Sequence, residues 1–279
     1  MARRAVRFLA ILIALGVVFY SRSRGTSSRV DEDDTPAADT SADGRFRPTV
    51  QEGLGASVAI LLDQSGSMED APDSGGDTPK YRIAREAIAQ VLAQTDSFVT
   101  LHPDFQVNVG LYVFDGDVRM ELPIARYRGS ALTAALANLP EPSGNTAIGD
   151  AMQRATRDLY AAGTIRKYLL VVTDGANTSG REPDVVAREI ARRSEGAVKL
   201  YMVAFDIDAA RFGFVNEVRG AVLHANDGPG LRASLDTLYR GRILAEAVDA
   251  GETIPARTDS AGTRGSRPVP SSVSPIPPR

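Results

Sequence analysis

Short apolar runs alternate with amphipathic stretches through the middle of this 279-residue chain. In Val58-Ala59-Ile60-Leu61-Leu62 and Tyr168-Leu169-Leu170-Val171-Val172 the apolar residues are consecutive, which is typical of strands that are buried on both faces of a sheet. Six segments with this character are predicted to be strands: 56–62, 106–114, 118–122, 167–173, 198–205 and 221–224.

The stretches between these runs carry apolar residues at helical spacing. In residues 80–94, for example, apolar side chains recur every three or four positions while charged side chains lie on the opposite face. The predicted helices are 80–94, 130–139, 147–162, 182–194, 209–218 and 231–248.

This alternation predicts a doubly wound α/β fold of the Rossmann-like kind, with a mostly parallel sheet and helices on both faces. The strands 106–114 and 118–122 are joined only by Asp115-Gly116-Asp117, so we expect a hairpin that gives the sheet one antiparallel edge strand. The predicted domain spans residues 54–248.

The N-terminus has the pattern of a membrane-targeting segment. Arg3, Arg4 and Arg7 precede an uncharged apolar run at 8–20, which as a helix would span about 20 Å, short of the roughly 30 Å of a bilayer core. No Ala-x-Ala cleavage signal follows the run. We therefore expect residues 1–20 to be an uncleaved, single-pass signal anchor with the domain on the extracytoplasmic side. A cleaved signal peptide, giving a secreted protein, is the alternative.

The segments that flank the predicted domain lack apolar periodicity. Residues 21–53 are rich in Ser, Thr, Asp and Pro and are predicted to be a disordered acidic linker. Residues 249–279 are rich in Pro and Ser and are predicted to be a disordered tail. The chain has a net charge of -3, no Trp and no basic stripe, so we expect no nucleic-acid binding. The absence of Cys excludes disulfides and thiolate metal sites.

Three polar clusters lie at expected strand ends or helix starts, where ligands bind in open α/β sheets. They are Asp63-Gln64-Ser65-Gly66-Ser67, Gly144-Asn145-Thr146 and Thr173-Asp174-Gly175. Taken singly, each polar residue could be an ordinary cap or turn residue. Together they predict an all-oxygen site that suits Mg²⁺, with Mn²⁺ or Ca²⁺ as alternatives. The candidate metal-binding residues are Asp63, Ser65, Ser67, Thr146 and Asp174.

The order and context of these three motifs resemble the von Willebrand factor type A (vWA) domain. The resemblance implies a metal-ion-dependent adhesion site in which Ser65, Ser67 and Thr146 present hydroxyls to the ion, while Asp63 and Asp174 hold it through waters and hydrogen bonds. It also implies an open coordination position for an exposed Asp or Glu of a protein partner. An ion with few direct carboxylate ligands keeps enough positive charge to attract that partner.

We therefore expect a membrane-tethered, metal-dependent protein-binding module. The alternative is a metal-independent scaffold or assembly subunit of a larger membrane-associated complex. We do not expect an enzyme, because the chain has only two histidines, and Ser65 and Ser67 lack a Gly-x-Ser-x-Gly elbow. The acidic, glycine-rich loop 68–79 beside the site could shield the metal, compete as an internal carboxylate, shape partner choice or have no special role.

Overall fold

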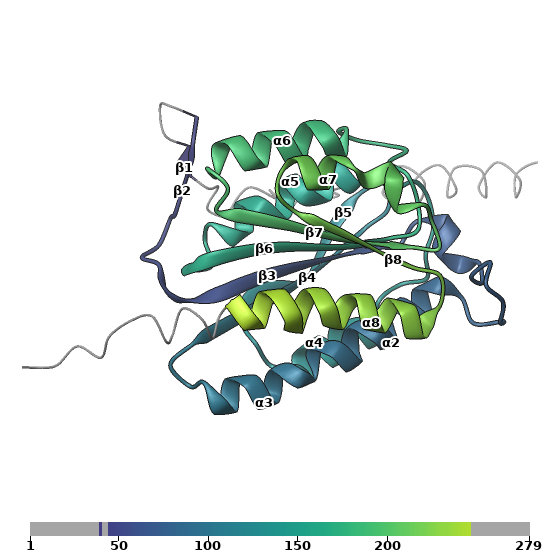
Figure 1. The fold of residues 1–279 in the computed structure, drawn as a ribbon, viewed down its shortest axis with the longest axis horizontal. Helices are drawn as coiled ribbons and strands as arrows, with labels where there is room; N and C mark the ends of the chain where they lie inside the picture. The colour runs from purple at the N-terminus through teal and green to yellow at the C-terminus, as the bar shows by residue number, and fades with distance from the viewer. Residues whose placement is uncertain (1–38, 41–43, 247–279) are drawn as a thin grey trace, which may run out of the picture.

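The computed structural model describes residues 39–40 and 44–246, and its centre is a six-stranded sheet of order β5-β4-β3-β6-β7-β8 (Figure 1). All neighbouring strands are parallel except β5, which pairs antiparallel with β4 at one edge. The predicted fold class, including the antiparallel edge strand, is confirmed. The strands are β3 (Gly53–Asp63), β4 (Gln106–Phe114), β5 (Val118–Arg126), β6 (Thr164–Thr173), β7 (Val198–Phe205) and β8 (Ala221–Ala225).

The central strand β3 explains why its apolar residues are consecutive. Side chains of a strand alternate between the two faces of the sheet. Val58 and Ile60 accordingly pack into the core on one face, and Ala59 and Leu61 pack into the core on the other, all fully buried. A strand covered by helices on both faces has no position left for a polar side chain that lacks a partner.

Helices cover both faces of the sheet (Figure 1). One layer contains α2 (Lys80–Leu92), α3 (Gln94–Leu101), α4 (Gly129–Ala137) and α8 (Gly228–Leu238), and the other contains α5 (Ile148–Leu159), α6 (Pro183–Arg193) and α7 (Phe214–Glu217). Short helical turns complete the chain: η1 (Gly66–Glu69), η2 (Ala209–Phe212) and η3 (Tyr239–Leu244).

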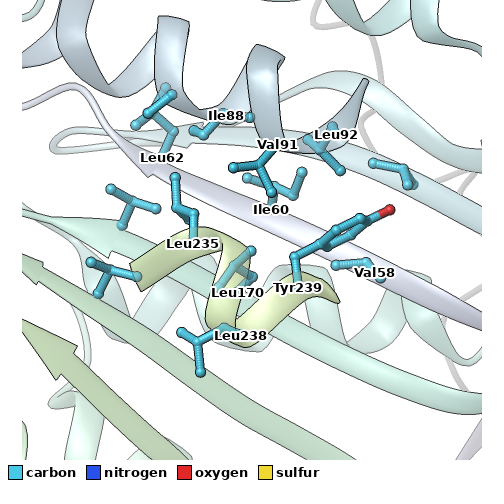
Figure 2. Packing of buried hydrophobic residues seen from close by; sticks show 14 of the residues in the cluster. Val58, Ile60, Leu62, Ile88, Val91, Leu92, Leu170, Leu235, Leu238 and Tyr239 are labelled. Carbon is cyan, nitrogen blue, oxygen red and sulfur yellow. The ribbon is translucent and has the colours of Figure 1, made fainter. Parts of the chain in front are cut away.

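The helix α8 packs against both α2 and the sheet. Figure 2 shows the β3 residue Ile60 lying between Ile88 and Val91 of α2 on one side and Leu235 of α8 and Tyr239 of η3 on the other. These side chains are at most 3% exposed. The apolar stripe of α2 that the sequence predicted is therefore the contact surface for α8.

All six helices differ from the predicted ranges: α4, α5 and α6 by one to three residues at an end, and the other three in how they are divided or where they begin and end. The predicted helix 80–94 ends at Leu92, and a separate helix, α3, continues to Leu101. The predicted helix 209–218 is divided into η2 and α7. The helix predicted at 231–248 already begins at Gly228, because Asp227 accepts a hydrogen bond from the Gly230 backbone N–H and caps the first turn. Its continuation η3 is a π-helix.

The segment just before the domain also differs from the predicted disordered linker. β1 (Asp39–Thr40) and β2 (Phe46–Arg47) form an antiparallel pair, the ring of Phe46 stacks on Tyr160 at 5.1 Å, and Thr49 N–H donates to the Tyr160 carbonyl. Residues 44–53 thus pack on the domain, because Phe46 supplies an apolar ring that the linker composition obscured.

The predictions for residues 1–38, 41–43 and 247–279, which include the signal anchor and the tail, concern parts of the chain outside the described residues. The helices among the described residues are all too short or too polar to span a bilayer.

Candidate metal centre

The carboxylate of Asp63 is fixed at the end of β3, where it is fully buried. One oxygen, Oδ1, accepts a 2.8 Å hydrogen bond from the Ser65 backbone N–H, and the other, Oδ2, accepts a 2.6 Å bond from the Thr173 hydroxyl of the neighbouring strand β6. Both oxygens therefore have protein partners, and the carboxylate cannot rotate without breaking a bond.

The two serine hydroxyls lie beside this carboxylate and lead to Asp174. Ser65 Oγ and Ser67 Oγ are 3.3 Å apart, and Ser67 Oγ donates to Asp174 Oδ1 at 2.8 Å. The turn after β3 is thus joined to the turn after β6. Four of the five predicted site residues belong to one hydrogen-bonded cluster.

The fifth residue, Thr146, faces the same cluster across Gly175. A Cβ atom on Gly175 would lie 3.5 Å from Thr146 Oγ1 and 3.8 Å from Ser67 Oγ. The glycine therefore leaves a space beside these two hydroxyls, and a side chain at this position would contact both. The structure brings all five predicted residues together around the ends of β3 and β6.

The loop after β6 holds Thr146 in place through side chains that the sequence analysis missed. Thr146 N–H donates to the Thr178 hydroxyl at 2.8 Å, and Ile148 N–H donates to Asn177 Oδ1 at 2.9 Å. Asn177 therefore satisfies a donor at the N-terminus of α5. A Cβ on Gly149 would lie 2.1 Å from the Arg181 carbonyl oxygen, so the close approach of this loop to α5 requires glycine.

Lys80, the first residue of α2, is a further member of the centre that the sequence analysis missed. Its Nζ lies 2.7 Å from Asp174 Oδ2 and 3.6 Å from Asp206 Oδ2, and the three side chains are 9%, 0% and 8% exposed. In sequence, Lys80 has the appearance of a solvated residue at the start of an amphipathic helix. Only the proximity of the ends of β6 and β7 gives it two acidic partners.

The electrostatics of the centre follow from burial. Burial opposes the charge of Lys80, but the hydrogen bond and charge of Asp174, together with Asp206, outweigh it and raise the Lys80 pKa above its ordinary value. Burial raises the pKa of Asp63 to about 7, although its hydrogen bonds from Ser65 and Thr173 act in the opposite direction. A buried carboxylate of this kind is stabilised in its charged form by a nearby cation.

The donor set fits a hard divalent cation. Within residues 39–40 and 44–246, no group of three or more His, Cys, Asp or Glu side chains is arranged to hold a metal. The candidate centre instead combines two carboxylates with three hydroxyls, and magnesium accepts such oxygen ligands while keeping several waters.

The acidic loop 68–79 extends from the centre toward the ends of β7 and β8. Lys80 N–H donates to the Asp70 carbonyl and closes the base of the loop at 2.9 Å. Farther along, Asp73 N–H donates to Asp206 Oδ2 at 3.1 Å and Ser74 Oγ donates to the Asn226 carbonyl at 2.7 Å. The loop is thus anchored beside Asp206, which also contacts Lys80.

The von Willebrand factor type A domain model matches residues 57–222. The fold is similar to the D319A mutant of the PilB minor pilin from Streptococcus sanguinis, with a TM-score of 0.57, 12% identity, and coverage of 73% of this chain and 65% of the pilin. It is also similar to a multiply mutated aerotolerance-related membrane protein from Bacteroides fragilis, with a TM-score of 0.52, 18% identity, and coverage of 68% and 100%.

A third similar structure is a von Willebrand factor type A protein from Catenulispora acidiphila, with a TM-score of 0.52, 21% identity, and coverage of 71% of this chain and 43% of that one. This chain therefore spans less than two thirds of the pilin and of the Catenulispora protein. At these identities the likeness is one of fold. No curated protein sequence matches the chain.

Proposed function

This chain belongs to the von Willebrand factor type A domain family, and we propose that its domain is a metal-dependent protein-binding module. In this proposal Mg²⁺ bound by Asp63, Ser65, Ser67, Thr146 and Asp174 supplies a Lewis-acidic contact for an exposed Asp or Glu of a partner protein. The role is binding and not catalysis.

The Thr146 and Ser67 hydroxyls lie beside Gly175, and Ser65 Oγ lies 3.3 Å from Ser67 Oγ. This grouping of three hydroxyls is the observation that supports the proposal. Asp63 and Asp174 are already engaged with protein hydrogen-bond donors or with Lys80. The hydroxyls are therefore the natural direct ligands, while the carboxylates orient them and the waters of the ion. Neutral ligands leave positive charge for an acidic partner.

We also propose that residues 1–20 tether the module to a membrane as a single-pass anchor, with the domain on the extracytoplasmic side. The basic residues followed by an apolar run support this, and one protein of similar fold is itself described as a membrane protein. Secretion after signal-peptide cleavage remains the alternative.

A metal-independent scaffold or assembly subunit is the second candidate function. The ion pair of Lys80 with Asp174 favours it, because a protein cation already compensates one carboxylate of the centre. In that case association with a partner would persist in chelator.

The first experiment is calorimetric titration of Mg²⁺ and Mn²⁺ into the chelator-treated full chain and its Asp63→Ala variant. We expect the unchanged chain to bind and Asp63→Ala to lose binding. Asp104→Ala is the matched control, since it removes an exposed carboxylate near the start of β4, at the opposite end of the strands. Circular dichroism checks that all three fold.

The second experiment tests capture of an acidic residue with immobilised peptides that contain Asp or Glu and with Asn or Gln counterparts. We expect retention only on the acidic peptides and only with metal present. A chain that binds no metal would contradict the proposal and favour the scaffold.

A further inference from the structure

A buried lysine connects the candidate metal centre with the end of β7. Lys80 Nζ contacts Asp174 Oδ2, and the other oxygen of Asp174 accepts the hydrogen bond from Ser67. Asp174 is therefore held by a hydroxyl of the centre on one side and by a protein cation on the other. Its side chain is fully buried, so solvent and salt screen the pair little.

Lys80 compensates part of the negative charge of the candidate centre. Asp63 and Asp174 carry two negative charges when ionised, and Lys80 compensates one of them at a distance of 2.7 Å. A buried carboxylate that loses a cationic partner is costly to keep ionised. A divalent ion and Lys80 therefore act on the same carboxylate with charges of the same sign.

We propose that Lys80 is a positioning residue that serves as the internal counter-charge of the metal centre. It holds Asp174 in place when no ion is bound, and it weakens metal binding by cancelling part of the negative charge that attracts the ion. A bound ion thereby keeps more of its charge for an acidic partner. This inference rests on the metal-binding function proposed above.

Lys80 lies between two acidic side chains, and the second of them, Asp206, is itself held by hydrogen bonds. Asp206 is a non-glycine residue with φ of 57°, a conformation that costs energy for most side chains. Its backbone N–H donates to the Ala225 carbonyl at 2.6 Å, and its carboxylate accepts from Asp73 N–H in the acidic loop. Asp206 thus offsets part of the Lys80 charge and also binds the acidic loop through Asp73.

Two substitutions with opposite expected effects test the proposal by Mn²⁺ calorimetry on the full chain. Lys80→Met keeps the length of the side chain but removes its charge, so we expect Mn²⁺ to bind roughly tenfold more tightly. Asp206→Asn leaves Lys80 less compensated, so we expect weaker Mn²⁺ binding than in the unchanged chain. A purely structural role would weaken binding in both variants.

Arg82→Met is the matched control, because it removes an exposed positive charge from the same helix and should leave Mn²⁺ affinity within about twofold. Thermal melting supplies the second readout. Without metal, Lys80→Met should melt at a lower temperature than the unchanged chain, and Mn²⁺ should raise its melting temperature by more.

The outcomes separate the two proposals. Equal or weaker Mn²⁺ binding by Lys80→Met, with normal binding by the unchanged chain, overturns the counter-charge role alone. No Mn²⁺ binding by the unchanged chain overturns both the metal-binding function and the counter-charge role. If metal-free Lys80→Met melts at the same temperature as the unchanged chain, Lys80 does not hold Asp174 in place. If Lys80→Met does not fold, Asp206→Asn can still overturn the proposal, since tighter or equal Mn²⁺ binding by that variant contradicts it.

Discussion

At the residue scale, the candidate centre depends on oxygens that are fixed before any ligand arrives. Both oxygens of Asp63 accept hydrogen bonds, and Asp174 is held between Ser67 and Lys80. Groups that are held in this way need little rearrangement when an ion binds, which lowers the entropic cost of binding. The space beside the Thr146 and Ser67 hydroxyls is also restricted, because a side chain at Gly175 would contact both.

Gly175→Ala tests that space directly. The new methyl group would make ordinary van der Waals contacts with Thr146 Oγ1 and Ser67 Oγ, at 3.5 and 3.8 Å, so we expect the free energy of unfolding to change by less than about 1 kcal/mol. The methyl would nevertheless lie against two of the hydroxyls that are proposed to bind the ion. We expect Mn²⁺ affinity, measured by calorimetry, to fall by about tenfold or more, a loss of at least about 1.4 kcal/mol.

Gly213→Ala is the control for Gly175→Ala. Its new Cβ would also lie 3.5 Å from its nearest neighbour, the Ala210 carbonyl oxygen, but at the end of η2 and away from the candidate centre. Unchanged Mn²⁺ affinity in Gly175→Ala would mean that the hydroxyls do not surround the ion.

At the element scale, different parts of the central strands support the candidate centre and the end of the described chain. The C-terminal ends of β3 and β6 carry the candidate centre, while the end of the last helical segment contacts β6 and β7 away from their C-terminal ends. There Glu246 Oε2, just after η3, accepts hydrogen bonds from Tyr168 of β6 at 2.8 Å and from Lys199 of β7 at 2.6 Å. This contact fixes the end of the described chain to two neighbouring strands.

Glu246→Gln tests the anchor through its pH dependence. Burial opposes ionisation of Glu246, but the hydrogen bonds from Lys199 and Tyr168 outweigh it and hold its pKa below the ordinary value. Because the folded-state pKa is below the unfolded one, the charged anchor stabilises the protein above the unfolded pKa of about 4.3, and this stability is lost as pH falls through the folded pKa.

We expect Glu246→Gln to lower the free energy of unfolding by about 0.5–1 kcal/mol at pH 7, since the pair is partly solvent-exposed. Urea titrations should show this difference from the unchanged chain shrinking as the pH is lowered below about 4. The exposed Glu141→Gln serves as the control. A difference that does not vary with pH would assign the effect to packing instead of charge.

The sequence predicted the existence and order of the strands, but β3, β5 and β6 extend beyond the predicted ranges 56–62, 118–122 and 167–173. Buried strands such as β4 and β7 have the predicted bounds, because an apolar run ends where the strand leaves the core. Helix ends depend on local hydrogen bonds instead, so the cap at Asp227 moved the start of α8. The π-helical continuation depends on tertiary packing, which no local pattern specifies.

The candidate site was predictable for a related reason. Asp63, Ser65, Ser67, Thr146 and Asp174 belong to short motifs that fall at strand ends or just before a helix, where the topology brings them together. Lys80 and Asp206 belong to no such motif, and their contact depends on the course of the loop before α2. Sequence patterns could therefore supply the hydroxyls and carboxylates of the centre but not its internal cation.

At the scale of the whole molecule, a folded domain is preceded by a segment with the pattern of a membrane anchor. Residues 44–53 pack onto the domain through Phe46 and Thr49, so this part of the predicted linker belongs to the folded part of the chain. If residues 1–20 are the membrane anchor proposed above, the module is held near that membrane, which raises the effective concentration of partners there.

Fractionation of cells that express the full chain tests the anchor. Residues 8–20 form an uncharged apolar run after three arginines, so we expect the full chain to sediment with membranes and to resist alkaline extraction. Leu12→Arg preserves the length but places a charge in the run, at a cost of about 2.5–3.5 kcal/mol for insertion at the centre of a helix. That variant should lose membrane association. Release of the expressed protein as a shorter, soluble, extracytoplasmic species would instead demonstrate a cleaved signal peptide. The metal centre would then belong to a secreted, diffusible protein.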